Sequence, residues 1–237
     1  MKYFTFNIIF LLLLTTPQFS QNLEDKNVLV VWGGWDGHKP EKFANIIEDW
    51  LKTQNANYQI TEGVEVYDDL DSLLKYDLII QSVTMGELHW KQEENLTKAV
   101  KSGVGIAGAH GGLGDSFRNN TSYQFMIGGQ WVSHPGNKVK FEVEILKDEL
   151  TKGVNNFEVE TEQYYMHVDP SIDVVAQSKF TSDPYPWIEN VVMPVAWKKK
   201  YGNGKVFYIS LGHDPNEFLK YNEAWTLLTR GFIWAVR

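Results

Sequence analysis

The chain contains no cysteine. It therefore has no disulfide, no thiolate metal site and no cysteine to carry a lipid. Catalysis by a cysteine nucleophile is excluded for the same reason.

Positive charge is also scarce. The chain has 22 Lys and Arg but 30 Asp and Glu, which gives a net charge of −8. Proteins that bind nucleic acids or anionic membranes usually present a basic surface. We therefore expect a small molecule as the partner and no nucleic acid. Self-association into a homo-oligomer stays open at this stage.

Long apolar runs are scarce too, and the clearest one lies at the N-terminus. Lys2 precedes an apolar run from Phe4 to Leu14, and small and polar residues follow to Ser20. This layout is typical of a secretory signal peptide, and the run is short for a membrane span. We predict a signal peptide over residues 1–20, a single domain over 21–237, and export to the periplasm or the medium without stable membrane insertion after cleavage. An uncleaved anchor is the alternative.

The first half of the mature chain predicts alternating strands and helices. An apolar run over 28–32 leads into a Gly-rich loop, and apolar residues from Phe43 to Leu51 recur at helical spacing. Further strands are expected at 58–61, 76–83 and 104–109, and a helix at 90–103. This alternation indicates an α/β fold with three layers, a mostly parallel central sheet between helices.

The second half predicts antiparallel additions to that sheet. Residues 137–146 alternate apolar and polar side chains, and residues 193–214 read as a hairpin around a Tyr-Gly-Asn-Gly turn. Residues 215–237 have the pattern of one terminal helix. No internal repeat divides the chain.

The stretch "GVGIAGAHGGLGD" predicts a buried strand that ends in a sharp turn with His110 at its crest. Small residues flank His110 as they flank the nucleophile of a strand-to-helix elbow. Imidazole in this position suits a general base or a metal ligand. A structural histidine under a loop is the alternative.

Three histidines are expected to meet at one edge of the sheet. Ligands of open α/β sheets bind at the carboxyl ends of the strands. His38, His110 and His213 each follow a predicted strand. Asp214 and Glu217 lie just behind His213, either to orient its ring or, for Asp214, to cap a helix.

These motifs together resemble the ThuA-like (trehalose utilisation) family. The resemblance covers residues 28–236 and rests on "VLVVWGGWDGHKPEKF", "GIAGAHGG", "EVETEQYYMHV", "PVAWKKKYGNGKVFYISLGHD" and "RGFIWAV". It implies the class I glutamine amidotransferase-like, flavodoxin-like fold, with His110 in place of the catalytic cysteine. It also implies a role in carbohydrate breakdown beside oxidoreductases that convert disaccharides into 3-keto derivatives.

We assign candidate roles on this basis. A ketone at C3 of a sugar acidifies the C2 proton, so a base of near-neutral pKa can remove it and expel the C1 substituent. The catalytic candidates are His110, His213 and Glu162. The candidates for substrate binding are Gly33, Gly34, Trp35, Asp36, His38, Gly111, Trp131, His134 and Tyr165.

Two questions stay open from the sequence. His38, His110 and His213, with Glu162, would suit a divalent metal such as zinc or iron, although no local metal motif is present. Thirty-three aromatic residues, among them nine Trp, also suit stacking on sugars. The alternatives to an enzyme are therefore a non-catalytic carbohydrate-binding protein and an accessory subunit of a sugar oxidoreductase.

Overall fold

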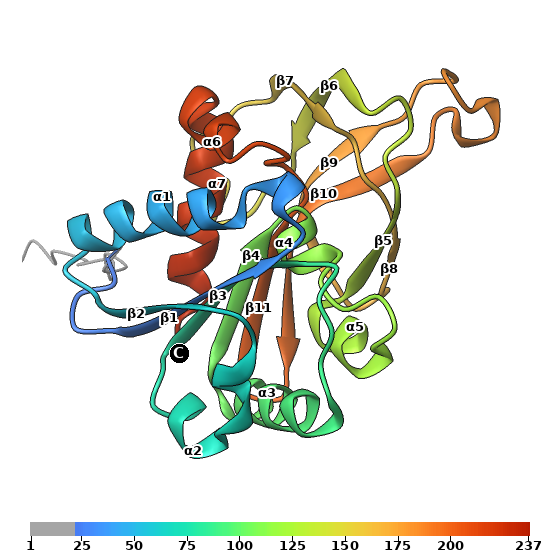
Figure 1. The fold of residues 1–237 in the computed structure, drawn as a ribbon. Coiled ribbons are helices and arrows are strands. Elements are labelled where there is room, and N and C mark those ends of the chain that lie inside the picture. Colours follow the sequence, from blue (N-terminus) through green and yellow to red (C-terminus); the bar gives the residue numbers. More distant parts are fainter. Residues whose placement is uncertain (1–21) are drawn as a thin grey trace, which may run out of the picture.

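The computed structural model describes residues 22–237, which form three layers with helices on both faces of a central sheet (Figure 1). The predicted signal peptide, residues 1–20, lies outside the described residues, so it stays a prediction. Within residues 22–237, no helix combines the length and apolarity that crossing a membrane requires.

The strands are β1 (Asn27–Gly34), β2 (Asn57–Glu62), β3 (Leu78–Thr84), β4 (Gly105–Ala109), β5 (Gly129–Ser133), β6 (Lys138–Ile145), β7 (Phe157–Glu162), β8 (Tyr165–Val168), β9 (Asp173–Lys179), β10 (Val192–Tyr201) and β11 (Gly204–Ile209). The α-helices are α1 (Pro40–Thr53), α2 (Leu70–Leu73), α3 (Trp90–Ser102), α4 (Gly111–Gly114), α5 (Thr121–Ile127), α6 (Asn216–Lys220) and α7 (Asn222–Ala235). Short 3-10 helices are η1 (Asp36–His38), η2 (Glu65–Asp68) and η3 (Pro186–Ile188).

In the described part of the chain the main sheet has nine strands in the order β2-β1-β3-β4-β11-β10-β9-β6-β7. Strands β2, β1, β3, β4 and β11 run parallel to one another. From β11 to β7 the pairs are antiparallel, and β5 and β8 form a separate antiparallel ribbon. The predicted fold class, a parallel sheet extended by antiparallel strands, is confirmed.

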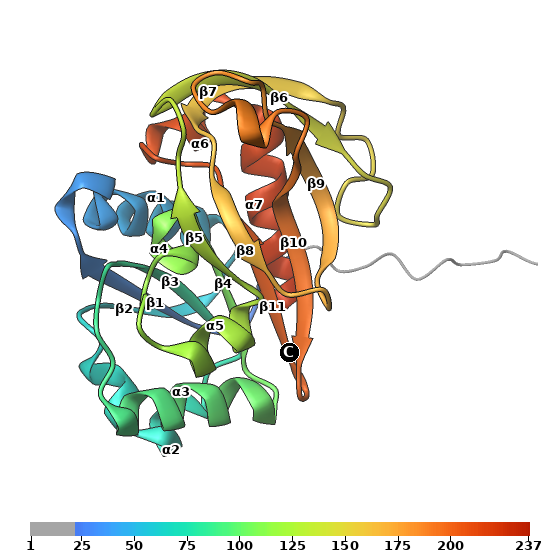
Figure 2. The same ribbon diagram turned by 90° about the vertical axis from the view of Figure 1, so that its right-hand side faces the viewer.

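Alternation along β1 divides the core between the two faces of the sheet. Val28 and Val30 pack with apolar residues of α1 and α7, whereas Leu29 and Val31 pack with those of α3 and α5. A strand that is buried on both faces fits the continuous apolar run in the sequence. The helices on the two faces are seen from the side in Figure 2.

The C-terminal segment differs from the single helix that its pattern predicts. It forms α6 and α7, separated by Tyr221, whose backbone is extended. The Tyr221 hydroxyl accepts a hydrogen bond from the backbone N–H of Glu160 at 3.1 Å. The break therefore lets one side chain tie the helices to β7.

Candidate functional site

His110 stands on the turn from β4 to α4. Its backbone lies at φ 49° and ψ −139°, outside the ordinary regions, and its N–H donates to the Ile209 carbonyl at 2.7 Å. Gly111 has to lack a side chain, because a Cβ there would lie 2.6 Å from the His38 ring. Such strained turns cluster at functional sites. This one brings two imidazoles together.

His38 ends η1, just beyond β1. Its Nδ1 lies 3.0 Å from Thr84 Oγ1, and its ring centroid is 4.6 Å from that of His110 and 5.3 Å from that of His213. Gly33 and Gly34 lie in the strand that we expected to end before them, because they pair with the last residues of β3. Their backbone therefore belongs to the sheet and not to the Gly-rich loop in which we expected them to bind substrate.

Glu162 is the centre of the histidine cluster. It is the last residue of β7, and the chain leaves the main sheet directly after it, because β8 pairs with β5. One oxygen, Oε2, lies 3.2 Å from His110 Nε2 and 3.3 Å from His213 Nδ1. The other, Oε1, lies 3.6 Å from His134 Nδ1. Glu160 stays exposed on the strand, so only Glu162 enters the cluster.

The hydrogen-bond partners of His110 determine which ring nitrogen carries its proton. Nδ1 lies 2.8 Å from the carbonyl oxygen of Ser210, which can only accept, so Nδ1 is the donor. In neutral His110 the lone pair on Nε2 then faces the Glu162 carboxylate. Nδ1 of His134 and of His213 are buried there without a hydrogen-bond partner. Imidazole lone pairs and a carboxylate repel one another at these distances. The arrangement is therefore favourable only if protons or a metal ion lie between them.

Burial and mutual contact shift the pKa values of the cluster in opposite directions. Burial, followed by His110 and His213, lowers the pKa of His38 to about 3. Burial also lowers the pKa of His110, although Glu162 opposes this. The neighbouring Glu162 carboxylate raises the pKa of His213. Burial raises the pKa of Glu162, but His110 and His213 outweigh it and hold that pKa below its usual range. The two innermost rings are therefore neutral at pH 7.

The donor set fits a divalent transition metal. His38, His110, Glu162 and His213 each offer one ligand atom, and these atoms all lie within 4.8 Å of one another. Three imidazoles and a carboxylate suit zinc or ferrous iron. Imidazoles that bind a metal through one nitrogen usually donate a hydrogen bond from the other. His110 does so from Nδ1 to the Ser210 carbonyl.

The aromatic candidates occupy different positions around this cluster. Trp35 is half-exposed, with its ring edge-on to His38 at 4.8 Å, and Asp36 beside it is exposed. Trp131 packs against Arg118, whose guanidinium carbon lies 4.6 Å from the ring centroid, and against His134. These protein groups take ring surface that we expected a sugar to use.

The two adjacent tyrosines separate. Tyr165 packs against Phe180 at 5.7 Å between ring centroids. Tyr164 is the tyrosine against His110, with ring centroids 4.0 Å apart. The sequence predicts Tyr165 and not Tyr164 for the site, because the change of sheet between Glu162 and Tyr165 has no signal in the sequence. Thr84, the last residue of β3, contacts His38, and Ser210, which directly follows β11, contacts His110. Neither was predicted from the sequence.

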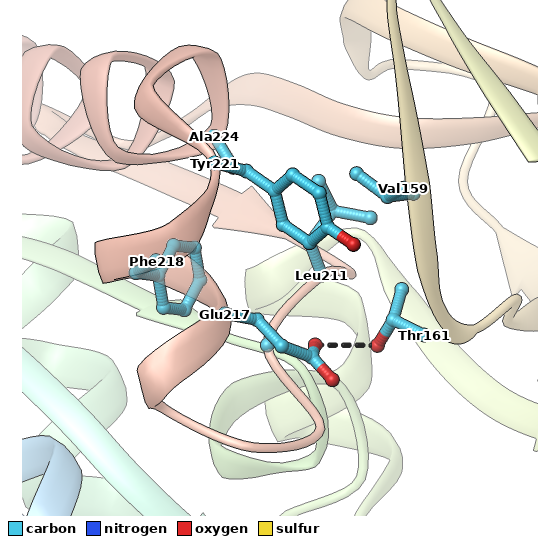
Figure 3. Close-up of a pocket in the computed structure, with 8 residues that line it drawn as sticks. Val159, Thr161, Leu211, Glu217, Phe218, Tyr221 and Ala224 are labelled. Atoms are coloured by element: carbon cyan, nitrogen blue, oxygen red, sulfur yellow. Dashed lines mark hydrogen bonds between the residues drawn. The ribbon is translucent and has the colours of Figure 1, made fainter.

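Asp214 and Glu217, which follow His213 in the sequence, bind other groups than the His213 ring. Asp214 pairs with Lys39 at 2.6 Å and accepts from the backbone N–H of Asn216. Glu217 accepts from the Thr161 hydroxyl at 2.6 Å, as Figure 3 shows, and pairs with Lys138 at 3.1 Å. Glu217 and Thr161 thus join the His213 loop to the end of β7, next to Glu162, whereas Glu162 itself contacts the ring.

Comparison with known families agrees with this geometry. The family described as ThuA, trehalose utilisation, matches residues 27–235. The chain belongs to the ThuA family.

Solved structures of ThuA-like proteins share this fold at low sequence identity. One from Bacteroides uniformis is 16% identical, with 90% of this chain and 92% of that chain covered and a TM-score of 0.72. Another, from Parabacteroides merdae, is 13% identical, with 90% of each chain covered and a TM-score of 0.74. A β-galactosidase from Bacillus circulans matches over 90% of this chain but 30% of its own, at 13% identity and a TM-score of 0.55. No curated protein matches the chain.

Proposed function

We propose that this ThuA family member is an enzyme that cleaves 3-keto-glycosides with the help of a divalent metal held by His38, His110, His213 and Glu162. The observation that carries the proposal is that nitrogens of three histidines converge on one buried carboxylate, and that two of them, Nδ1 of His134 and Nδ1 of His213, are buried without a hydrogen-bond partner. A purely structural cluster would satisfy these nitrogens with hydrogen bonds. Zinc or iron bound there would supply a Lewis acid for the ketone oxygen.

His134 is the group that we assign to proton transfer. It lies outside the four-residue ligand set, is half-buried, and has Glu162 Oε1 at 3.6 Å from Nδ1. His110, the base favoured by the sequence, is 2% exposed and both its ring nitrogens face protein groups. A substrate proton therefore reaches His134 more readily than His110.

The elimination balances with this single base. The His134 ring takes the proton from C2, the C–H electron pair forms the C1–C2 double bond, and the bond from C1 to the leaving oxygen breaks. The same ring then returns the proton to the leaving oxygen. The Glu162 carboxylate stabilises the imidazolium formed in between. Addition of water to the resulting enone completes a hydrolysis.

The chemistry of this substrate also defines the neighbouring reaction. A keto group at C3 arises when an oxidoreductase removes a hydride from C3 and a proton from its hydroxyl. We propose a functional link to such an enzyme and, from residues 1–20, a place of action outside the cytoplasm.

The test is to incubate residues 21–237 with 3-keto-trehalose and 3-keto-glucosides and to follow the anomeric carbon by NMR. Cleavage by the wild type and its loss in His110→Ala are the expected result. No cleavage, with equal line broadening of the sugar by both proteins, would overturn the proposal in favour of a carbohydrate-binding protein.

A further inference from the structure

The segment between β9 and β10, residues 180–191, forms an arm that projects from the sheet (Figure 1). It carries the sequence Pro-Tyr-Pro-Trp at 184–187. Every residue from 181 to 190 is exposed except Ile188. The arm presents the most exposed of the described large apolar side chains, Trp187 at 77%.

Two aromatic rings on the arm stack on each other. The rings of Tyr185 and Trp187 have centroids 4.8 Å apart and an interplanar angle of 26°. Tyr185 is 38% exposed. The pair therefore presents a flat apolar surface to solvent, and neither ring fills the core.

The root of the arm is fixed to the body of the protein. The N–H of Phe180 donates to the Val191 carbonyl at 2.9 Å, and the N–H of Asn190 donates to the Phe180 carbonyl at 3.0 Å. Phe180 and Ile188 are both buried in the core cluster that contains Tyr164. Pro184 and Pro186 restrict the backbone on either side of Tyr185. A preordered ring pair loses little entropy when it binds a ligand.

The arm approaches the turn that follows His134. Gly136 belongs to the turn in which the N–H of Asn137 donates to the His134 carbonyl. A Cβ placed on Gly136 would lie 3.7 Å from Pro184 Cδ, so Pro184 lies close to that turn. The arm therefore comes near the loop that carries His134 at Pro184, the residue before Tyr185.

The size and the rim of the ring pair favour a sugar over a protein. Within the arm, polar residues border the apolar segment on both sides: Thr181, Ser182, Asp183, Glu189 and Asn190. Stable protein interfaces bury about 1,200–2,000 Å² in total, which is far more than two rings provide. A pyranose matches this surface, because its C–H face can stack on a ring while its hydroxyls reach the polar border.

We propose that the Tyr185–Trp187 pair is a second sugar-binding subsite that holds an unmodified hexopyranose unit of a substrate longer than a disaccharide. This proposal rests on the proposed function for the identity of the substrate, but the binding itself requires no turnover. It assigns oligosaccharides as the substrate class.

The experiment titrates residues 21–237 with maltooligosaccharides and cellooligosaccharides of two to five units and follows the indole N–H signals by NMR. The Trp187 signal is expected to shift, with affinity rising from two units to longer chains. Trp187→Ala should weaken binding of the longer chains about fivefold, as loss of one aromatic contact does. Trp90→Ala is the matched control, because Trp90 is 74% exposed on α3, at the opposite end of the molecule (Figures 1 and 2).

Equal affinity of wild type and Trp187→Ala for every chain length would overturn the subsite. A dimer that forms in sedimentation and is lost in Trp187→Ala, without sugar binding, would overturn it in favour of a second copy as the occupant. Shifts of Trp187 without cleavage of any 3-keto-glycoside would support the subsite and refute the proposed reaction, so the two failures are distinguishable.

Discussion

Glu162 links the four imidazoles of the site. Its two oxygens lie 3.2–3.6 Å from nitrogens of three histidines, and a fourth, His38, packs against two of those rings. This carboxylate is therefore the one negative charge among the four residues that could hold a metal ion.

The substitution Glu162→Gln tests that role. It keeps the shape of the side chain and removes the charge and one ligand oxygen, so zinc affinity should fall at least about tenfold. Competition with a chromophoric chelator measures the change. Glu160→Gln is the control, because Glu160 is exposed two residues earlier on the same strand. An equal affinity of Glu162→Gln and wild type would contradict the assigned ligand set.

A contact between β7 and α6 joins the segments that carry Glu162 and His213. Thr161 is buried, and its hydroxyl bond to Glu217 crosses between the two elements (Figure 3). Thr161→Val removes that bond and leaves a buried carboxylate oxygen without its donor. The free energy of unfolding should fall by about 1–3 kcal/mol, as urea denaturation would measure.

Thr161→Ser is the matched control, since serine retains the hydroxyl. If the bond matters, the serine variant keeps most of the stability that the valine variant loses. Equal stability of the valine variant and wild type would mean that the contact contributes nothing.

A second contact joins β10 to the turn before β9. Lys199, which is 4% exposed, donates to Asp169 at 2.6 Å and to Ser171 at 2.9 Å. Lys199, followed by the backbone N–H of Ser171, lowers the pKa of Asp169 to about 2. Because the folded pKa lies below the unfolded value, the pair stabilises the protein above about pH 4 and loses this contribution as pH falls towards 2.

We predict that Asp169→Asn lowers the free energy of unfolding at pH 7 by roughly 2–3 kcal/mol, since the buried Lys199 ammonium loses the carboxylate that balances its charge. The difference from wild type should shrink between pH 4 and pH 2. Urea denaturation at each pH, with the exposed Asp173→Asn as control, gives the comparison. A difference that stays constant over this pH range would show that the pair does not titrate as described.

Elements with a single strong pattern could be predicted from the sequence. The buried strands and helix α1 follow from apolar periodicity, and the elbow at His110 follows from its flanking glycines. The break at Tyr221 and the change of sheet after Glu162 could not be predicted, because each depends on a contact with a distant strand.

At the scale of the whole molecule, the fold determines which residues meet. Parallel strands deliver His38, His110 and His213 to one edge of the sheet, as the alternation of strands and helices predicts. His134 and Glu162 arrive from the antiparallel half, whose pairing the sequence leaves open. Their convergence on the elbow is therefore the part of the site that needed the structure.

The position of the arm, residues 180–191, also could not be predicted from the sequence. The segment Pro-Tyr-Pro-Trp reads as a loop in the sequence, and its place beside the turn after His134 depends on tertiary packing. The acidic composition and the ThuA motifs, in contrast, are properties of the whole chain, and from them the sequence predicts a small molecule as the ligand.

The most direct test of the account measures cleavage of 3-keto-trehalose by wild-type protein after chelation and after return of one equivalent of zinc or ferrous iron. The account predicts that chelation abolishes cleavage and that one of the two metals restores it. Full cleavage by chelated protein that contains no transition metal would contradict the metal-assisted site, and absence of cleavage with every metal would contradict the proposed reaction.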